Sequence, residues 1–172
     1  MIVTAPDKAE QTAETVSVFL AGSIENGAAS PWQQSVASEI DKMGDVAIFN
    51  PRREHWDPSW SQSPNNPELR EQITWELANL MNADIVFFYF EVGTMAPISL
   101  LELGLCLGEG KNVIVVCDPG FWREANVHVT TAFFKENVMR TRLFTDMAEG
   151  IAALKREVAV YSLSRVLTSE RF

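Results

Sequence analysis

Residues that build covalent cross-links and metal sites are scarce in this sequence. Its 172 residues include two cysteines and two histidines. Cys106 and Cys117 lie in apolar runs, so we expect buried thiols in a reducing, cytoplasmic setting and no disulfide framework. His55 and His128 do not have the spacing of metal ligands. The sequence therefore gives no reason to expect a metal site.

Positive charge and long apolar runs are also scarce. The net charge of -9 argues against binding to a nucleic-acid polymer or to an anionic membrane surface. A small nucleoside is not excluded, because it needs a pocket rather than a basic face. No apolar run reaches the length of a membrane span, and the acidic residues within 1–15 argue against a signal peptide. The hydrophobic fraction of 47% is that of an ordinary globular protein, and the length favours one domain.

Signatures of the common nucleotide-binding and hydrolytic folds are missing as well. The chain has no G-x-G-x-x-G, G-x-x-x-x-G-K-[ST], G-x-S-x-G or H-E-x-x-H. It has instead short apolar runs alternating with segments of helical spacing. We expect strands at 16–20, 46–49, 85–90, 113–117 and 143–144, and helices at 32–43, 67–81, 97–109 and 145–157. Residues 126–134 begin with a strand-like alternation, and 50–67 read as a long loop of the kind that often carries function.

The alternation predicts a doubly wound α/β sheet of about five mostly parallel strands with helices on both faces. We expect a loose N-terminal segment at 1–15, one domain at 16–157 and a C-terminal helix or arm at 158–172. Ligands of such sheets bind at the carboxyl ends of the strands. The turns at 22–23, 50–53, 91–97 and 118–126 all lie at that edge. Candidate residues that are scattered in the sequence should therefore converge in space.

Glu102 is the most informative residue, because it is a carboxylate within an apolar helical segment. Ser99, Glu102 and Cys106 are three and four residues apart and share a face of that helix. Burying a carboxylate is costly unless it is paired or hydrogen-bonded. Glu102 is therefore either a structural acid that caps a loop or pairs with Arg52 or Arg53, or a catalytic group with a shifted pKa. A carboxylate can attack an anomeric carbon, because the transition state is cationic.

A second carboxylate follows from the helix predicted at 67–81. Gln72 and Glu76 are one turn apart, so they share a face. Glu76 would then contact the leaving group or a 3′-hydroxyl of a sugar. The alternative is an exposed acid on an amphipathic helix.

The loop that begins at residue 50 mixes donors, acceptors and an aromatic face. Arg52 and Arg53 can grip a carbonyl, a carboxylate or a phosphate. Trp56 can stack on a planar base, and Asn50 and Asp57 add polar groups. The alternative is a loop held by arginine–aspartate pairs, with the tryptophan filling the core.

Taken in order, several segments resemble the nucleoside 2-deoxyribosyltransferase family, and they look closest to its branch with an Asn-Pro-Arg-Arg motif. The segments are Phe19-Leu20-Ala21-Gly22-Ser23-Ile24, Asn50-Pro51-Arg52-Arg53 with Trp56-Asp57, Gln72-x-x-Trp75-Glu76, Ala83-Asp84-Ile85-Val86, Leu101-Glu102-Leu103-Gly104 and Asn126-Val127. The resemblance implies a flavodoxin-like fold and an enzyme that moves 2-deoxyribose between nucleobases without a metal or an organic cofactor. Its substrates would be a 2′-deoxynucleoside and a free nucleobase.

The resemblance also implies roles for particular residues. Glu102 matches the nucleophile that attacks C1′ and forms a covalent deoxyribosyl ester. Glu76 falls where the family has an aspartate. Asn126 falls where the family has an asparagine donated by a neighbouring subunit, which implies a homo-oligomer. The expected substrate-binding residues are Gly22, Ser23, Asn50, Arg52, Arg53, Trp56, Asp57, Gln72, Trp75, Thr94 and Ser99.

Two departures from the family pattern leave other functions open. Phe19 stands where the family has a tyrosine that assists the nucleophile, and Ala96 replaces a sugar-binding aspartate, for which Thr94 or Ser99 would substitute. Related N-hydrolases admit water, so hydrolysis of 2′-deoxynucleosides or their 5′-monophosphates is an alternative. In that case Arg52 and Arg53 would bind the phosphate. A third reading, favoured by the two departures, is a nucleotide-binding module without turnover.

Overall fold

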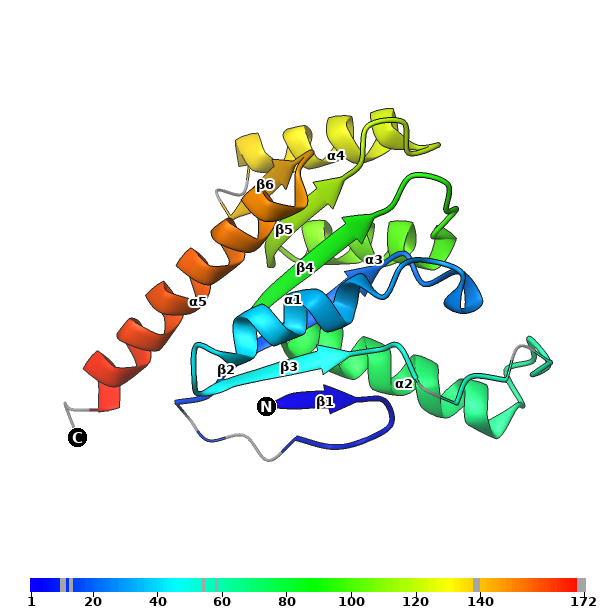
Figure 1. Ribbon diagram of the computed structural model, residues 1–172, viewed down its shortest axis with the longest axis horizontal. Helices are drawn as coiled ribbons and strands as arrows, with labels where there is room; N and C mark the ends of the chain where they lie inside the picture. The colour runs from blue at the N-terminus through cyan, green and yellow to red at the C-terminus, as the bar shows by residue number, and fades with distance from the viewer. Residues whose placement is uncertain (10–11, 13, 54, 58, 138–139, 170–172) are drawn as a thin grey trace.

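Six parallel strands form the sheet of the computed structural model, which describes residues 1–9, 12, 14–53, 55–57, 59–137 and 140–169 (Figure 1). In spatial order the strands are β1 (Ile2–Thr4), β3 (Val46–Asn50), β2 (Val16–Gly22), β4 (Ile85–Phe90), β5 (Asn112–Cys117) and β6 (Thr141–Phe144). Strands β4 and β5 are buried over their whole length, as continuous apolar runs predict for a parallel sheet. The doubly wound α/β fold is confirmed, with six parallel strands rather than about five.

Strand β1 accounts for the additional strand. Ile2 pairs with Ile48 of β3, and the side chain of Val3 is buried in the core. The terminal ammonium group of Met1 lies 2.8 Å from the carbonyl oxygen of Val46. The expectation of a loose segment over 1–15 is therefore wrong for its first residues. Three residues are too few for a sequence period to be recognised, and pairing with β3 decides their conformation.

Helices cover both faces of the sheet. Helices α1 (Trp32–Asp41) and α5 (Met147–Ser169) lie on one face, while α2 (Pro67–Asn82), α3 (Pro97–Gly108) and α4 (Glu124–Asn137) lie on the other (Figure 1). The strands alternate between these layers, because successive side chains of a strand point to opposite faces. In β2, for example, Phe19 packs with the layer of α2 and α3, whereas Leu20 packs with the layer of α1 and α5.

Helix α4 corrects the strand-like interpretation of 126–134. Val127 and Thr131, one helical turn apart, are both buried, whereas Val129 between them is 69% exposed. Over so few residues, a helix and a strand give similar patterns of hydrophobicity. The alternation at the start of this segment therefore did not distinguish a strand from a helix.

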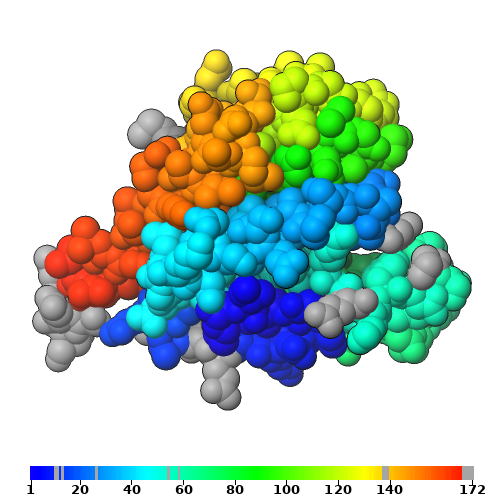
Figure 2. Space-filling view, viewed as in Figure 1, coloured from blue at the N-terminus to red at the C-terminus, as the bar shows by residue number. Residues whose placement is uncertain are grey.

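The C-terminal segment is a helix rather than a separate arm. Helix α5 runs without a break through Ser169 and combines the expected helix with most of the expected C-terminal segment. Its last turns extend beyond the body of the molecule (Figure 2). Arg165 anchors them through Asp84, at 2.7 Å. Among the described helices, α5 included, none is both long enough and apolar enough to cross a membrane.

The parallel sheet places the carboxyl ends of its strands at one edge. The turns that follow β2, β3, β4 and β5 meet there, and α3 begins there. A short 3-10 helix, η1 (Glu25–Gly27), forms part of the turn after β2. The candidate residues were expected to converge in space, and they do so to the extent that these turns meet at one edge of the sheet.

Candidate active site

Helix α3 carries Glu102 at this edge. The helix follows Ala96, whose left-handed backbone (φ 43°) turns the chain into Pro97. Ser99, Glu102 and Cys106 are all buried, as their shared helix face predicts. The Ser99 hydroxyl donates a hydrogen bond to the carbonyl oxygen of Gly22 at 2.8 Å, which fastens the first turn of α3 to the end of β2.

The carboxyl group of Glu102 has no compensating partner within the described part of the chain. No hydrogen bond or ion pair to it is present there, so pairing with Arg52 or Arg53, one of the two sequence-based alternatives, is not found. Burial raises the pKa of Glu102 to about 8, and the charge of Glu76 adds to this shift. Glu102 is thus a buried acid whose ionised form is held at high energy.

Gln72 and Glu76 lie together on α2, one turn apart. The amide nitrogen of Gln72 donates to Glu76 Oε1 at 2.7 Å and to the carbonyl oxygen of Pro51 at 2.9 Å. Burial raises the pKa of Glu76, while the bond from Gln72 and the charge of Arg53 oppose the shift. The alternative of a freely exposed acid does not hold for Glu76, which is partly buried.

Arg53 completes this arrangement from the loop after β3. Its Nε donates a short hydrogen bond to Gln72 Oε1, and its Nη2 lies 2.9 Å from Glu71. The guanidinium group also lies 5.8 Å from the centre of the Trp60 ring. Because Gln72 receives a donor on its oxygen, its amide nitrogen is turned toward Glu76. Arg53 therefore fixes the orientation of the amide that holds the second carboxylate.

Arg52 points the other way and binds the turn after β2. Its guanidinium group donates to the carbonyl oxygens of Ser30, Gly27 and Ala29, at 2.6, 3.0 and 3.1 Å. The side chain of Asn50 accepts the backbone N–H of Arg52 at 3.0 Å. The two arginines of the motif thus connect the strand-end loops to each other and to α2.

Hydroxyl groups hold the loop after β4 against β2. Ser23 Oγ lies 2.6 Å from Thr94 Oγ1 and accepts the backbone N–H of Glu91 at 3.0 Å. Thr94 in turn donates to the carbonyl oxygen of Glu91 at 2.8 Å. Gly22, at the end of β2, has a φ of 142°, and a Cβ there would lie 2.2 Å from the carbonyl oxygen of Tyr89. A side chain at position 22 would therefore clash with the neighbouring strand.

Glu25 belongs to the same edge, although the sequence reasoning missed it. Its Oε1 accepts the backbone N–H groups of Met95 and Ala96, at 2.7 and 2.6 Å. Glu25 has a left-handed backbone with φ 48°, which is uncommon for a residue other than glycine. An isolated acid in a polar turn gives no motif. The available signal was its position three residues after Gly22, at the end of the first long strand.

Three of the expected substrate-binding residues make their described contacts within the core and the long loop. Trp75 is buried in the core, and its indole N–H donates to the carbonyl oxygen of Asp7 at 2.7 Å. Trp56 packs edge-on against Trp60, with ring centres 5.0 Å apart. Asp57 is exposed and bonds only within its own turn among the described contacts. Their contacts favour structural roles in the core and in the long loop.

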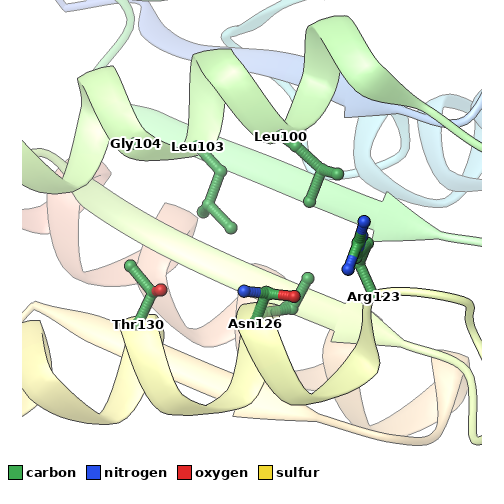
Figure 3. Close-up of a pocket in the computed structure, with 7 residues that line it drawn as sticks. Leu100, Leu103, Gly104, Arg123, Asn126 and Thr130 are labelled. Carbon is green, nitrogen blue, oxygen red and sulfur yellow. The ribbon is translucent and has the colours of Figure 1, made fainter.

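Asn126 lies on α4, across α3 from Glu102. It lines a cavity of about 320 Å³ between α3 and α4 (Figure 3). The other lining residues are Leu100, Leu103, Gly104, Arg123, Val127 and Thr130. Asn126 and Arg123 extend from the start of α4 into the space between the two helices. Glu102 does not line this cavity, so Asn126 and Glu102 of one chain lie on different sides of α3.

The family model described as "Nucleoside 2-deoxyribosyltransferase like" matches residues 15–121. This match confirms the family-level resemblance, while the Asn-Pro-Arg-Arg branch stays a prediction. No curated protein matches the chain. A conserved protein from Enterococcus faecalis V583 has a similar structure, with a TM-score of 0.57, 12% identity, and 84% of this chain and 98% of that chain covered. At this identity the likeness establishes the fold alone.

Proposed function

This chain belongs to the nucleoside 2-deoxyribosyltransferase-like family, and we propose that it transfers 2-deoxyribose between nucleobases through a covalent ester on Glu102. The observation that carries the proposal is the environment of Glu102. A carboxylate buried at the carboxyl edge without a described partner is poorly stabilised as an anion, so it gains most when a cationic sugar centre forms beside it.

The proposed reaction has two displacements at C1′ of a 2′-deoxynucleoside. A carboxylate oxygen of Glu102 forms a bond to C1′ while the bond from C1′ to the base nitrogen breaks. The departing base takes the bonding electron pair and a proton, which Glu76 supplies as an acid. An acceptor base then attacks C1′ from the vacated side, the ester bond breaks, and the proton of the acceptor returns to Glu76. The raised pKa of Glu76 suits this exchange of protons.

We further propose that a second copy of the chain completes the site with its Asn126. Helices α2, α3 and α4 lie side by side with α3 in the middle (Figure 1). A two-fold axis parallel to α3 would place α4 of one copy over α2 of the other and keep both carboxyl edges at the same end. Asn126 would then approach Glu102 of the partner. Ile98 and Leu101, both 62% exposed on α3, provide an apolar surface for this contact.

The first test is chromatography of reactions with thymidine, with and without adenine. Deoxyadenosine that forms only with adenine supports transfer. Thymine released without an acceptor would indicate the hydrolase instead, and 5′-monophosphates would be tested next. Glu102→Ala should abolish turnover and leave the fold intact, with Glu109→Gln, at the residue that follows α3, as a control. Full turnover in Glu102→Ala would exclude the covalent mechanism.

The contribution of Asn126 is tested by mixing two inactive variants. In a mixed dimer of Glu102→Ala and Asn126→Ala chains, a shared site would have both wild-type residues in one of its two copies. Mixing should then restore about one quarter of wild-type activity after subunit exchange. If each chain uses its own Asn126, no mixture will recover activity.

A further inference from the structure

The carboxylate of Glu25 stands at the start of α3 with only one of its oxygens occupied. Its Oε1 accepts the backbone N–H groups of Met95 and Ala96. Its Oε2 makes no hydrogen bond to any residue that the structure describes. These two amide donors fix the position of the carboxylate at the start of the helix. A carboxylate is thus held in place, with one oxygen that accepts no hydrogen bond from the described residues.

Glu25 and Glu102 are connected through the contact between the end of β2 and the first turn of α3. Ser99 is on the same helix face as Glu102, and its hydroxyl contacts the carbonyl of Gly22, three residues before Glu25. Glu102 is six positions after Ala96, which corresponds to a rise of about 9 Å along a helix. Side chains on a helix lean toward its N-terminus, so the carboxyl group of Glu102 is directed toward the start of α3, where Glu25 is bonded.

We propose that Glu25 binds the substrate by accepting a hydrogen bond from a free hydroxyl group of the deoxyribose, and that it excludes sugars phosphorylated at that hydroxyl. The proposal rests on the proposed function, since it places the sugar between Glu25 and Glu102. A carboxylate accepts readily from a hydroxyl and repels a phosphate, because both are anions. The expected substrates are unphosphorylated 2′-deoxynucleosides.

The hydroxyl groups considered as substitutes for the missing acid at position 96 already have partners. Thr94 is bonded to Ser23 and to the Glu91 carbonyl, and Ser99 is bonded to Gly22. Glu25 instead brings a carboxylate to the backbone of Ala96 itself. An acid missing from one element is thereby supplied by another that is 71 residues away in sequence.

The two arginines that were candidates for binding a phosphate are also engaged within the protein. Arg52 donates to three carbonyl oxygens of the turn that carries Glu25. Arg53 is bonded to Gln72 and paired with Glu71. Arg52 therefore positions the Glu25 turn, which agrees with recognition of a neutral sugar rather than a phosphorylated one.

The test compares Glu25→Gln and Glu25→Ala with the wild-type protein. Base exchange to adenine is measured from thymidine and from its 3′- and 5′-monophosphates. Both variants should lower kcat/KM for thymidine, by about 10- to 100-fold for Glu25→Ala. Glu25→Gln keeps the shape and offers an amide donor, so it should raise the relative use of one monophosphate and identify the hydroxyl. Glu91→Gln is the matched control, because Glu91 holds the same turn through the N–H of Ser30.

Each outcome decides the role of Glu25 separately from the proposed function. Unchanged kcat/KM for thymidine in Glu25→Gln would overturn the proposal while base exchange stands. An equal loss in Glu91→Gln would assign the effect to placement of the turn and overturn it as well. If the wild-type protein exchanges no base, calorimetry with thymidine replaces the rate measurement. Binding that Glu25→Gln weakens would support the proposal, and unaffected or absent binding would overturn it.

Discussion

Replacing Glu102 by glutamine should stabilise the folded protein, and the gain should grow with pH. The carboxyl group has a pKa of about 8 when folded and an ordinary value of 4.5 when exposed. Between these values the folded state binds more protons than the unfolded state, so the free energy of unfolding falls as pH rises. Below the lower value both states are protonated, and burial of the neutral acid brings no such loss.

The size of the effect follows from the same shift. Moving the pKa from 4.5 to about 8 amounts to a loss of about 5 kcal/mol once the pH exceeds the upper value. At neutral pH most of the interval has been crossed, and the loss is about 3 kcal/mol. Glutamine has nearly the same shape and never ionises, so Glu102→Gln should recover most of this free energy.

Urea unfolding of both proteins at acidic, neutral and alkaline pH measures the difference directly. The two proteins should be nearly equally stable around pH 4, and Glu102→Gln should be the more stable by about 3 kcal/mol at neutral pH. Glu109→Gln, an exposed substitution at the residue that follows α3, serves as the control. A difference between Glu102→Gln and the wild type that does not change with pH would refute the reasoning, because it would mean that the buried charge is compensated.

If Glu102→Gln is more stable than the wild type, the position of Glu102 is better explained by catalysis than by stability. A group used in chemistry is placed where it is reactive rather than where it is most stable, and natural proteins accept that cost at their active sites. The opposite result, a folded state destabilised by Glu102→Gln at all pH values, would indicate a structural ion instead. The stability experiment therefore separates the two interpretations of Glu102 without any assay of turnover.

The sequence predicted the parts of the fold where local pattern and burial agree. The apolar runs of β4 and β5 are strands because a parallel sheet covered on both faces buries every side chain. The convergence of candidate residues followed from topology alone, since parallel strands end at one edge. The shared face of Ser99, Glu102 and Cys106 was predictable because helical spacing fixes which residues are neighbours.

Contacts between distant segments decided which residues of α2 are buried and which polar residues join the candidate site. In α2, a helical stripe containing Ile73 and Leu77 suggests a buried face, yet both are exposed, while Gln72 and Trp75 are buried. Polar residues are buried here because their hydrogen bonds are satisfied by distant segments. Glu25 was missed for the same reason, since its partners lie about 70 residues further along the chain. No local pattern contains such a contact.

Two further results are expected from the described geometry. First, the pKa of Glu102, followed by NMR of its carboxyl group, should be lower in Glu76→Gln than in the wild type, because the charge of Glu76 raises it; an unchanged pKa would contradict this. Second, Gly22→Ala should destabilise the protein by about 3 kcal/mol or more. Its Cβ would lie 2.2 Å from the carbonyl oxygen of Tyr89, a backbone atom that cannot move without disturbing the pairing of β2 with β4. Gly27→Ala is the matched control, because Gly27 also has a positive φ of 92° but has open space around the position of a Cβ. It should cost only the backbone strain of about 1 kcal/mol. Thermal unfolding of the two variants compares them, and equal losses would show that strain at a positive φ, rather than the approach of β2 to β4, requires glycine at position 22.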